Sequence, residues 1–157
     1  MKKQSVLFVC LGNICRSPAA EAIFLDLINK KGLNDCFIVD SAGTGSWHIG
    51  KKADTRMRIA SKKRGVEILS RARQINSNDF EKFNYIVAMD DSNFQNIIDL
   101  KSRESLSDFS SIKKIQNFRS IFQEIEVPDP YFGGDEGFDH VLDILEDSVS
   151  VFLDTIC

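Results

Sequence analysis

A chain of 157 residues, with 43% hydrophobic and 27% charged residues, has the length of one domain, residues 1–157, and the make-up of a globular protein. Its net charge of −3 argues against general nucleic-acid binding, and no apolar run is long enough to cross a membrane, so we expect neither kind of partner. Because the four cysteines have neither the spacing of a metal site nor that of a secreted disulfide framework, we expect a cytoplasmic protein.

The N-terminal segment predicts a buried strand, a tight loop and the start of a helix. Residues 6–9 are all apolar, which is typical of a parallel strand covered on both faces. Gly12 and Asn13 tolerate unusual backbone angles, so the chain can turn there. Ser17 suits a helix N-cap and Pro18 suits the first helical position. Because a loop between a strand end and a helix N-terminus turns several N–H groups towards one point, the sequence predicts an anion site here.

Two side chains make this anion site a candidate reaction centre. Cys10 opens the loop and Arg16 closes it. The N–H groups, the helix dipole and the guanidinium all favour the thiolate of Cys10 over its thiol. The fork of Arg16 can hold two oxygens of a tetrahedral oxyanion. A lone cysteine at a strand end is more often a small buried hydrophobic residue, but the complete pattern of Cys, five residues, Arg, Ser and Pro favours a nucleophile.

Strands and helices alternate through the middle of the chain. Apolar spacing after the loop predicts an amphipathic helix that stops near Gly32, followed by a short strand over 36–39 and a loop over 41–46. We then expect a charged helix over 54–64 and an extended or irregular segment over 70–75.

The second half of the chain continues the alternation. It predicts a short helix over 78–83, an apolar strand over 85–89, a helix from Ser92, a strand over 112–118 and a long C-terminal helix. The predicted fold class is therefore α/β, a doubly wound, four-stranded parallel sheet with helices on both faces. Such sheets bind ligands at the carboxyl ends of their strands, which is where the anion loop begins.

A second catalytic group is required if the thiolate attacks a phosphate ester. The reaction must expel an alkoxide or phenoxide, and this leaving group needs a proton from a general acid. Asp129 is the candidate, because the prolines on both sides of it stiffen the backbone and can aim the carboxyl group. Alone, such an Asp is more often a turn residue. Cys10 and Arg16, together with the family resemblance given below, make it our choice of acid, and then of the base that activates water.

Three other positions have both a structural and a functional interpretation. Trp47 is either a partly buried core aromatic or a wall beside the phosphate site. The paired carboxylates that begin at Asp90 suggest a metal or acid–base site, but we favour a cap on the following helix. Cys15 is either a buried thiol or the partner of Cys10 in a reversible disulfide. We interpret His48 as a surface residue and assign it no role.

Residues 10–18, Cys-Leu-Gly-Asn-Ile-Cys-Arg-Ser-Pro, resemble the phosphate-binding loop of the low-molecular-weight protein tyrosine phosphatases. The resemblance returns, in the order of that family, at residues 40–44, 71–74, 88–93 and 127–131. It implies a flavodoxin-like topology with strand order 2-1-3-4. It also implies metal-independent hydrolysis of phosphotyrosine in a protein, or of a small aryl phosphate, without a cofactor. We expect a monomer or weak dimer.

The resemblance assigns roles to individual residues. Catalysis would rest on a phosphocysteine at Cys10, with Arg16 and Asp129. Phosphate and substrate would be held by Leu11, Gly12, Asn13, Ile14, Cys15, Ser17, Trp47, Tyr131 and Phe132. Ser17 would also stabilise the leaving thiolate, while the loop would be supported by Ser41, Ser70 and Asp90. Many members of the family have a His where this chain has Ser70, so the bracing of the loop differs here.

Alternatives remain open. Arsenate reductases share the fold and loop but need further cysteines, and none lies between Cys36 and Cys157. Relatives that act on phosphoarginine tend to have Thr where this chain has Ile14. A non-catalytic phosphate-binding module is the least favoured, because nucleophile, guanidinium and acid are all present. The Lys- and Arg-rich segment 51–73 is either a set of solvated helix faces or a basic rim that attracts phosphorylated substrates.

Overall fold

The computed structural model describes residues 3–122, 126–131 and 133–157. Within them, four parallel strands form one sheet: β1 (Gln4–Cys10), β2 (Phe37–Gly43), β3 (Tyr85–Ala88) and β4 (Ser111–Lys114). Their order is β2-β1-β3-β4, so the predicted α/β fold class and the strand order 2-1-3-4 are both confirmed.

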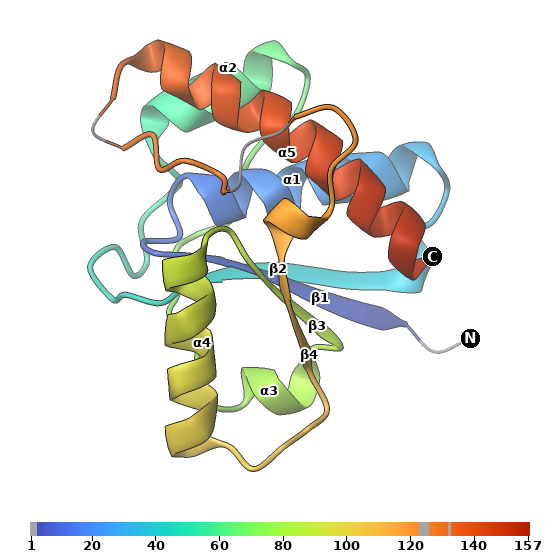
Figure 1. Ribbon diagram of the computed structural model, residues 1–157. Helices are drawn as coiled ribbons and strands as arrows, with labels where there is room; N and C mark the ends of the chain where they lie inside the picture. The colour runs from blue at the N-terminus through green and yellow to red at the C-terminus, as the bar shows by residue number, and fades with distance from the viewer. Residues whose placement is uncertain (1–2, 123–125, 132) are drawn as a thin grey trace.

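Helices cover both faces of the sheet (Figure 1). On one face lie α1 (Arg16–Lys30), α2 (Thr55–Lys63) and the long α5 (Asp135–Ile156), and on the other lie α3 (Asp79–Lys82) and α4 (Asp91–Glu104).

The central strand shows why both layers form. Val6 and Phe8 of β1 belong to the apolar cluster under α1 and α5, whereas Leu7 and Val9 belong to the cluster under α4. All four are fully buried, as expected for a parallel strand with an unbroken apolar run.

Two predicted boundaries were wrong. The loop expected over 41–46 starts later, because β2 continues to Gly43 in register with β1, pairing Phe8 with Ser41 and Cys10 with Gly43. A Cβ at Gly43 would lie 2.8 Å from the carbonyl oxygen of Leu11, so only glycine lets the anion loop pass this close. Small polar residues had suggested a loop where the fold needs a buried, tightly approached strand end.

The strand expected over 112–118 is also shorter than predicted. Pairing with β3 ends at Lys114, and a 3-10 turn over Ile115–Asn117 follows. Ile115 is fully buried in the cluster that α5 covers. The apolar side chain therefore leaves the sheet to pack under a helix, which a strand pattern read from the sequence does not distinguish from continued pairing.

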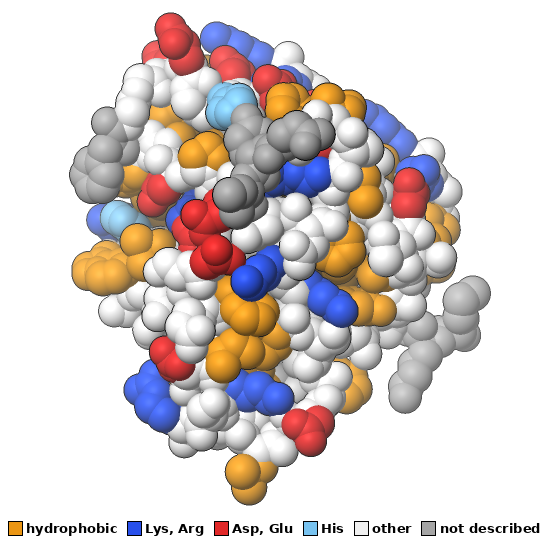
Figure 2. Space-filling model, in the orientation of Figure 1, with side chains coloured by type: hydrophobic (Ala, Val, Ile, Leu, Met, Phe, Trp, Pro, Cys, Tyr) orange, Lys and Arg blue, Asp and Glu red, His pale blue; other side chains and the backbone are white. Residues whose placement is uncertain are grey.

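Surface charge is mixed on the face that Figure 2 shows, where Lys and Arg side chains are interspersed with Asp and Glu. Among the described residues, no helix is both long and apolar enough to cross a membrane.

Candidate active site

The loop between β1 and α1 encloses the sulfur of Cys10. Cys10 is the last residue of β1 and Arg16 is the first of α1. Asn13 adopts a left-handed backbone conformation with φ of 58°, which Asn tolerates better than most residues. This turn aims the Asn13 N–H at Cys10 Sγ, at 3.3 Å. The loop therefore wraps the sulfur at a helix N-terminus, which is the place where the sequence leads us to expect an anion site.

A hydrogen-bond network around Asn13 holds the loop in shape. Its side-chain Nδ2 donates to Ser17 Oγ at 2.8 Å and to Ser41 Oγ at 3.0 Å, and its Oδ1 accepts from the Arg73 N–H at 3.0 Å. Ser17 Oγ also lies 3.0 Å from Cys10 Sγ. The loop is thus tied to β2 and to the irregular segment before α3, and the Ser17 hydroxyl can donate to a thiolate.

Arg16 lies at the base of the site with only 3% of its side chain exposed. Its Nη1 donates to Asp90 Oδ2 at 2.6 Å and to the Val127 carbonyl at 3.1 Å, while its Nη2 lies 3.7 Å from Asp129 Oδ2. Burial opposes the charged form, but the charge of Cys10 and the carboxylate of Asp90 outweigh it and raise the pKa of Arg16. The guanidinium is therefore a permanent, fixed cation.

Asp90 serves two elements at once. Its Oδ1 accepts from the Asn93 N–H at 2.6 Å and caps α4, while its other oxygen holds Arg16. The structure thus places Asp90 as the helix cap that the sequence favoured over a metal or acid–base pair. In the described part of the chain, no group of three or more His, Cys, Asp or Glu side chains could hold a metal ion.

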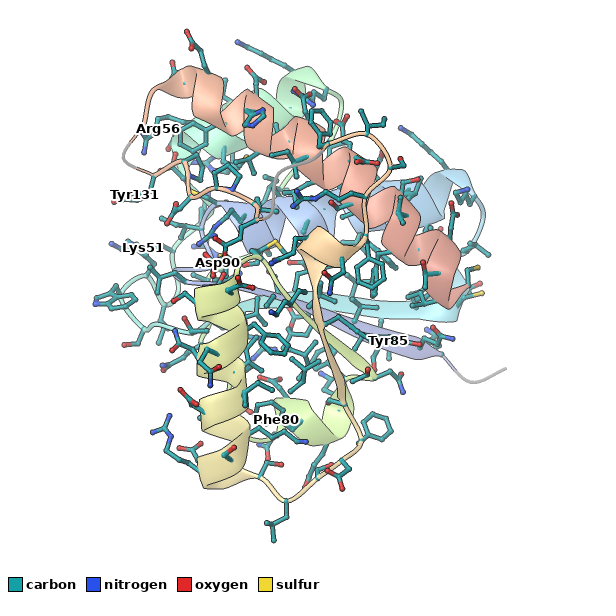
Figure 3. The ribbon with its side chains drawn as sticks, viewed as in Figure 1. Lys51, Arg56, Phe80, Tyr85, Asp90 and Tyr131 are labelled. Atoms are coloured by element: carbon teal, nitrogen blue, oxygen red, sulfur yellow. The ribbon has the colours of Figure 1, made fainter. Side chains whose placement is uncertain are left out.

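A cavity of about 320 Å³ opens above the sulfur and the guanidinium. It is lined by Cys10, Leu11, Gly12, Ile14, Cys15, Arg16, Trp47, His48, Asp129 and Tyr131. Figure 3 shows Asp90 and Tyr131 at the same end of the sheet, far from Tyr85 at the other. Trp47 lines the cavity and is 67% exposed, so it is not a core aromatic.

Asp129 is oriented by its own turn and by α2. Its Oδ1 accepts from the Tyr131 N–H at 3.1 Å, which leaves Oδ2 on the side of Arg16. Arg56 of α2 donates from Nη2 to the Tyr131 carbonyl at 2.8 Å, and its guanidinium lies 4.6 Å from the ring centre of Phe138. The turn that carries the carboxyl is therefore fastened to a neighbouring helix.

Comparison with known proteins identifies the family to which this arrangement belongs. The model of the family described as low molecular weight phosphotyrosine protein phosphatase matches residues 5–157. The chain belongs to this family. A relative from Schizosaccharomyces pombe named low molecular weight phosphotyrosine protein phosphatase is 42% identical, over 99% of this chain and 98% of its own.

Solved structures agree. The crystal structure of a protein tyrosine phosphatase from Entamoeba histolytica is 43% identical, with a TM-score of 0.92, over 98% of this chain and 97% of that chain. A Drosophila arginine phosphatase is 35% identical, with a TM-score of 0.90, over 96% of each chain. The solved structures that resemble this chain therefore include one named a tyrosine phosphatase and one named an arginine phosphatase.

In this member of the low molecular weight phosphatase family, the hydrogen bonds that support the loop around Cys10 extend to Glu21, which the sequence analysis missed. Ser41 Oγ donates to Glu21 Oε1 at 2.6 Å. Burial raises the pKa of the Glu21 carboxyl, while hydrogen bonds from Ser41 and Ser70 partly offset this effect. Ser70 was expected to brace the loop. Its hydrogen bond goes to Glu21, which in turn accepts from Ser41, so Ser70 supports the loop indirectly. No sequence signal separated Glu21 from the other charged positions of its helix.

Two more residues of the site were missed. His48 lines the cavity, with its ring centre 6.1 Å from that of Tyr131, although the sequence gave it no role. Its position directly after Trp47 was the available signal. Arg56 belonged to a helix that was predicted only as charged, and nothing in its spacing pointed to Tyr131. Phe132, expected among the residues that hold the substrate, lies outside the described residues.

The two cysteines of the loop differ in their surroundings. Both are free and buried. Burial and, next, the carboxylate of Asp54 raise the pKa of the Cys15 thiol. Cys15 therefore stays protonated at neutral pH. Cys10 is the sulfur that accepts a backbone N–H, from Asn13, and that shares a hydrogen bond with the Ser17 hydroxyl.

Proposed function

We propose that this chain hydrolyses phosphotyrosine and other aryl phosphate monoesters through a phosphocysteine at Cys10. The observation that carries the proposal is that the sulfur of Cys10, the buried guanidinium of Arg16 and the carboxyl group of Asp129 border one cavity with an aromatic wall. Because the nucleophile must stay reduced, the proposed activity belongs in a reducing compartment such as the cytoplasm.

In the first step, the Cys10 thiolate attacks phosphorus while two phosphate oxygens bind the fork of Arg16 and the loop N–H groups. The sulfur–phosphorus bond forms as the bond from phosphorus to the ester oxygen breaks. Asp129 gives its proton to that departing oxygen, and the alcohol or phenol leaves.

In the second step, the Asp129 carboxylate takes a proton from a water molecule that attacks the phosphocysteine. The sulfur–phosphorus bond breaks and inorganic phosphate forms. The Ser17 hydroxyl, 3.0 Å from Cys10 Sγ, stabilises the thiolate that is released.

The cavity favours a flat ring over a short side chain. Trp47 and Tyr131 both line it, and Ile14 adds an apolar surface. A phosphotyrosine ring can fill such a slot while its phosphate reaches the loop, whereas phosphoserine is too short. The fold also occurs in an arginine phosphatase, so phosphoarginine is the second candidate and must be compared directly.

Hydrolysis of p-nitrophenyl phosphate in EDTA tests the mechanism. We expect Cys10→Ser to abolish turnover and Asp129→Ala to lower kcat by about 10²–10⁴-fold, the usual worth of a general acid. Asp35→Ala, an exposed acid before β2, is the matched control and should be neutral. The Asp129→Ala loss should shrink for leaving groups that need no proton.

Two results would contradict the proposal. Activity that survives Cys10→Ser would exclude the covalent intermediate. A higher kcat/KM for phosphoarginine than for phosphotyrosine would replace the proposed substrate class while leaving the covalent mechanism intact.

A further inference from the structure

A second hollow lies beside the cavity described above. It measures about 650 Å³ and shares two of its lining residues, Leu11 and Trp47, with that cavity. The other residues come from the loop after β2, from the segment before α3 and from one stripe of α4: Thr44, Gly45, Gln74, Ile75, Asn96, Asp99, Leu100, Ser102 and Arg103. We call this hollow the α4 groove. Figure 1 shows the loop after β2 and α4 on the same side of the molecule.

The position of the α4 groove fits an extension of the substrate. Leu11 and Trp47 form the boundary between the two hollows and are 40% and 67% exposed. A polypeptide whose phosphorylated ring lies against Trp47 leaves the cavity at this boundary. An extended chain advances about 3.3–3.6 Å per residue, so a few residues are enough to enter the groove. A free aryl phosphate does not reach that far.

One charged side chain in the α4 groove is available for a ligand. Within the described part of the chain, no carboxylate lies within ion-pair distance of the Arg103 guanidinium, whose hydrogen bond runs from Nε to the Asp99 carbonyl at 3.4 Å. Neighbouring lysines are engaged, since Lys101 lies 3.5 Å from Asp108 and Lys114 lies 3.1 Å from Asp91. Arg103 is therefore a cation on the groove wall that can pair with an incoming carboxylate.

The other groups of the α4 groove suit an extended peptide. Asn96 is an exposed amide that can pair with peptide N–H and C=O groups. The Nε2 of Gln74 donates to the Thr44 carbonyl at 3.1 Å, which leaves its amide oxygen to accept from a peptide N–H, and Leu100 adds an apolar surface. Asp99 sets a limit on charge. One of its carboxylate oxygens accepts from Gln95 at 2.9 Å, and its charge opposes an acidic side chain placed next to it.

We propose that the α4 groove binds the substrate polypeptide on one side of the phosphotyrosine, and that Arg103 selects an acidic side chain there. This inference rests on the proposed phosphotyrosine phosphatase activity and adds the part of the substrate that lies outside the reacting group. Asp99 tunes the choice, because its carboxylate repels the same acidic side chain that Arg103 attracts.

The experiment compares kcat/KM for a series of phosphotyrosyl peptides. The parent has alanines around the phosphotyrosine, and each relative has one Glu at a successive position before or after it. Wild type is compared with Arg103→Gln and Asp99→Asn. Lys101→Gln is the matched control, since it removes a positive charge from the same helix but does not line the groove.

We expect Glu at one or two positions, all on the same side of the phosphotyrosine, to raise kcat/KM of the wild type about two- to fivefold, the worth of an exposed ion pair. Arg103→Gln should remove this preference and Asp99→Asn should increase it. Lys101→Gln should leave it unchanged. High salt should weaken it, and none of the variants should alter turnover of p-nitrophenyl phosphate.

If the wild type shows no preference for Glu, or if Arg103→Gln keeps the preference, the proposed subsite is wrong. Either result leaves the proposed phosphatase activity unaffected. Inactivity of the wild type towards p-nitrophenyl phosphate is a different result, because it would overturn the proposed function and the subsite together.

Discussion

At the scale of single residues, Gly45 determines where Trp47 can lie. A Cβ at Gly45 would overlap Cζ3 and Cε3 of the indole, so the ring rests directly on the glycine backbone. The Trp47 residue is otherwise largely exposed. The aromatic wall of the cavity therefore depends on a missing side chain two residues away.

Replacing that glycine should displace the wall. We expect Gly45→Ala to raise KM for aryl phosphates roughly two- to tenfold, which corresponds to the loss of about 0.5–1.5 kcal/mol of ring packing. Because Trp47 is the only Trp, its fluorescence should shift in the same variant. Gly134→Ala is the control, since a Cβ there meets nothing within 4 Å. An unchanged KM with unchanged emission would contradict the prediction.

Glu21 gives a prediction about pH. Burial, and to a lesser extent Asp40, raises the pKa of this carboxyl above its ordinary value of 4.5, so the folded state binds its proton more tightly than the unfolded state. The free energy of unfolding should therefore fall as pH rises from 4.5 through the raised pKa, by at most about 1.4 kcal/mol per pH unit. Glu21→Gln should remove this part of the decline.

Urea unfolding at a series of pH values measures the effect as the difference between Glu21→Gln and wild type. Asp26→Asn, one turn or so along the same helix, controls for the loss of a negative charge on α1. Stability curves of Glu21→Gln and wild type that run parallel across the acidic range would show that Glu21 does not titrate in this way.

Sequence analysis could group some residues of the candidate site from local spacing alone, and it missed others. Cys10, Asn13 and Arg16 share one loop, so motif spacing was enough to place them at one site. Glu21 and Arg56 act through partners at Ser41 and Tyr131, which are distant in the sequence. Contacts of this kind depend on how helices dock on the sheet, and local patterns do not encode that docking.

At the scale of elements, each strand delivers one part of the site at its carboxyl end. The loop after β1 carries Cys10 to Arg16, the loop after β2 carries Trp47, β3 leads to Asp90, and the segment after β4 carries Asp129. The alternation of strands and helices could be read from the sequence, and the strands of such a sheet end at one edge, so the meeting of these loops could be predicted. The ends of β2 and β4 could not be predicted, because they depend on which side chains are buried in the fold and not on local composition.

The fastening of the Asp129 turn to α2 is open to test. Arg56→Ala removes the donor to the Tyr131 carbonyl, so the carboxyl group should be less well aimed. We expect kcat to fall about tenfold, less than the 10²–10⁴-fold expected when a general acid is lost, and most for poor leaving groups. Arg58→Ala is the matched control, because Arg58 donates to the Ala53 carbonyl instead. Equal losses for good and poor leaving groups would argue against this role of Arg56.

At the scale of the whole molecule, α5 joins the layer that supports the site. Phe152 of α5 packs against the rings of Phe8 in β1, Phe24 in α1 and Phe118, with centres 5.1–6.3 Å apart. It is fully buried. The ring therefore ties α5 to the strand and helix that flank the loop around Cys10.

Removing this ring should destabilise the protein without touching the chemistry. We expect Phe152→Ala to lower the free energy of unfolding by about 3–5 kcal/mol, the usual cost of deleting a buried Phe side chain. That is a large share of a typical total of about 5–15 kcal/mol, so unfolding should begin at a much lower urea concentration.

Ile121→Ala is the control. This position is 71% exposed, so the substitution should change the free energy of unfolding by no more than about 0.5 kcal/mol. Because Phe152 does not line the cavity, kcat per folded molecule should stay near that of the wild type. A loss of activity larger than the loss of folded protein would mean that α5 also positions the loop around Cys10.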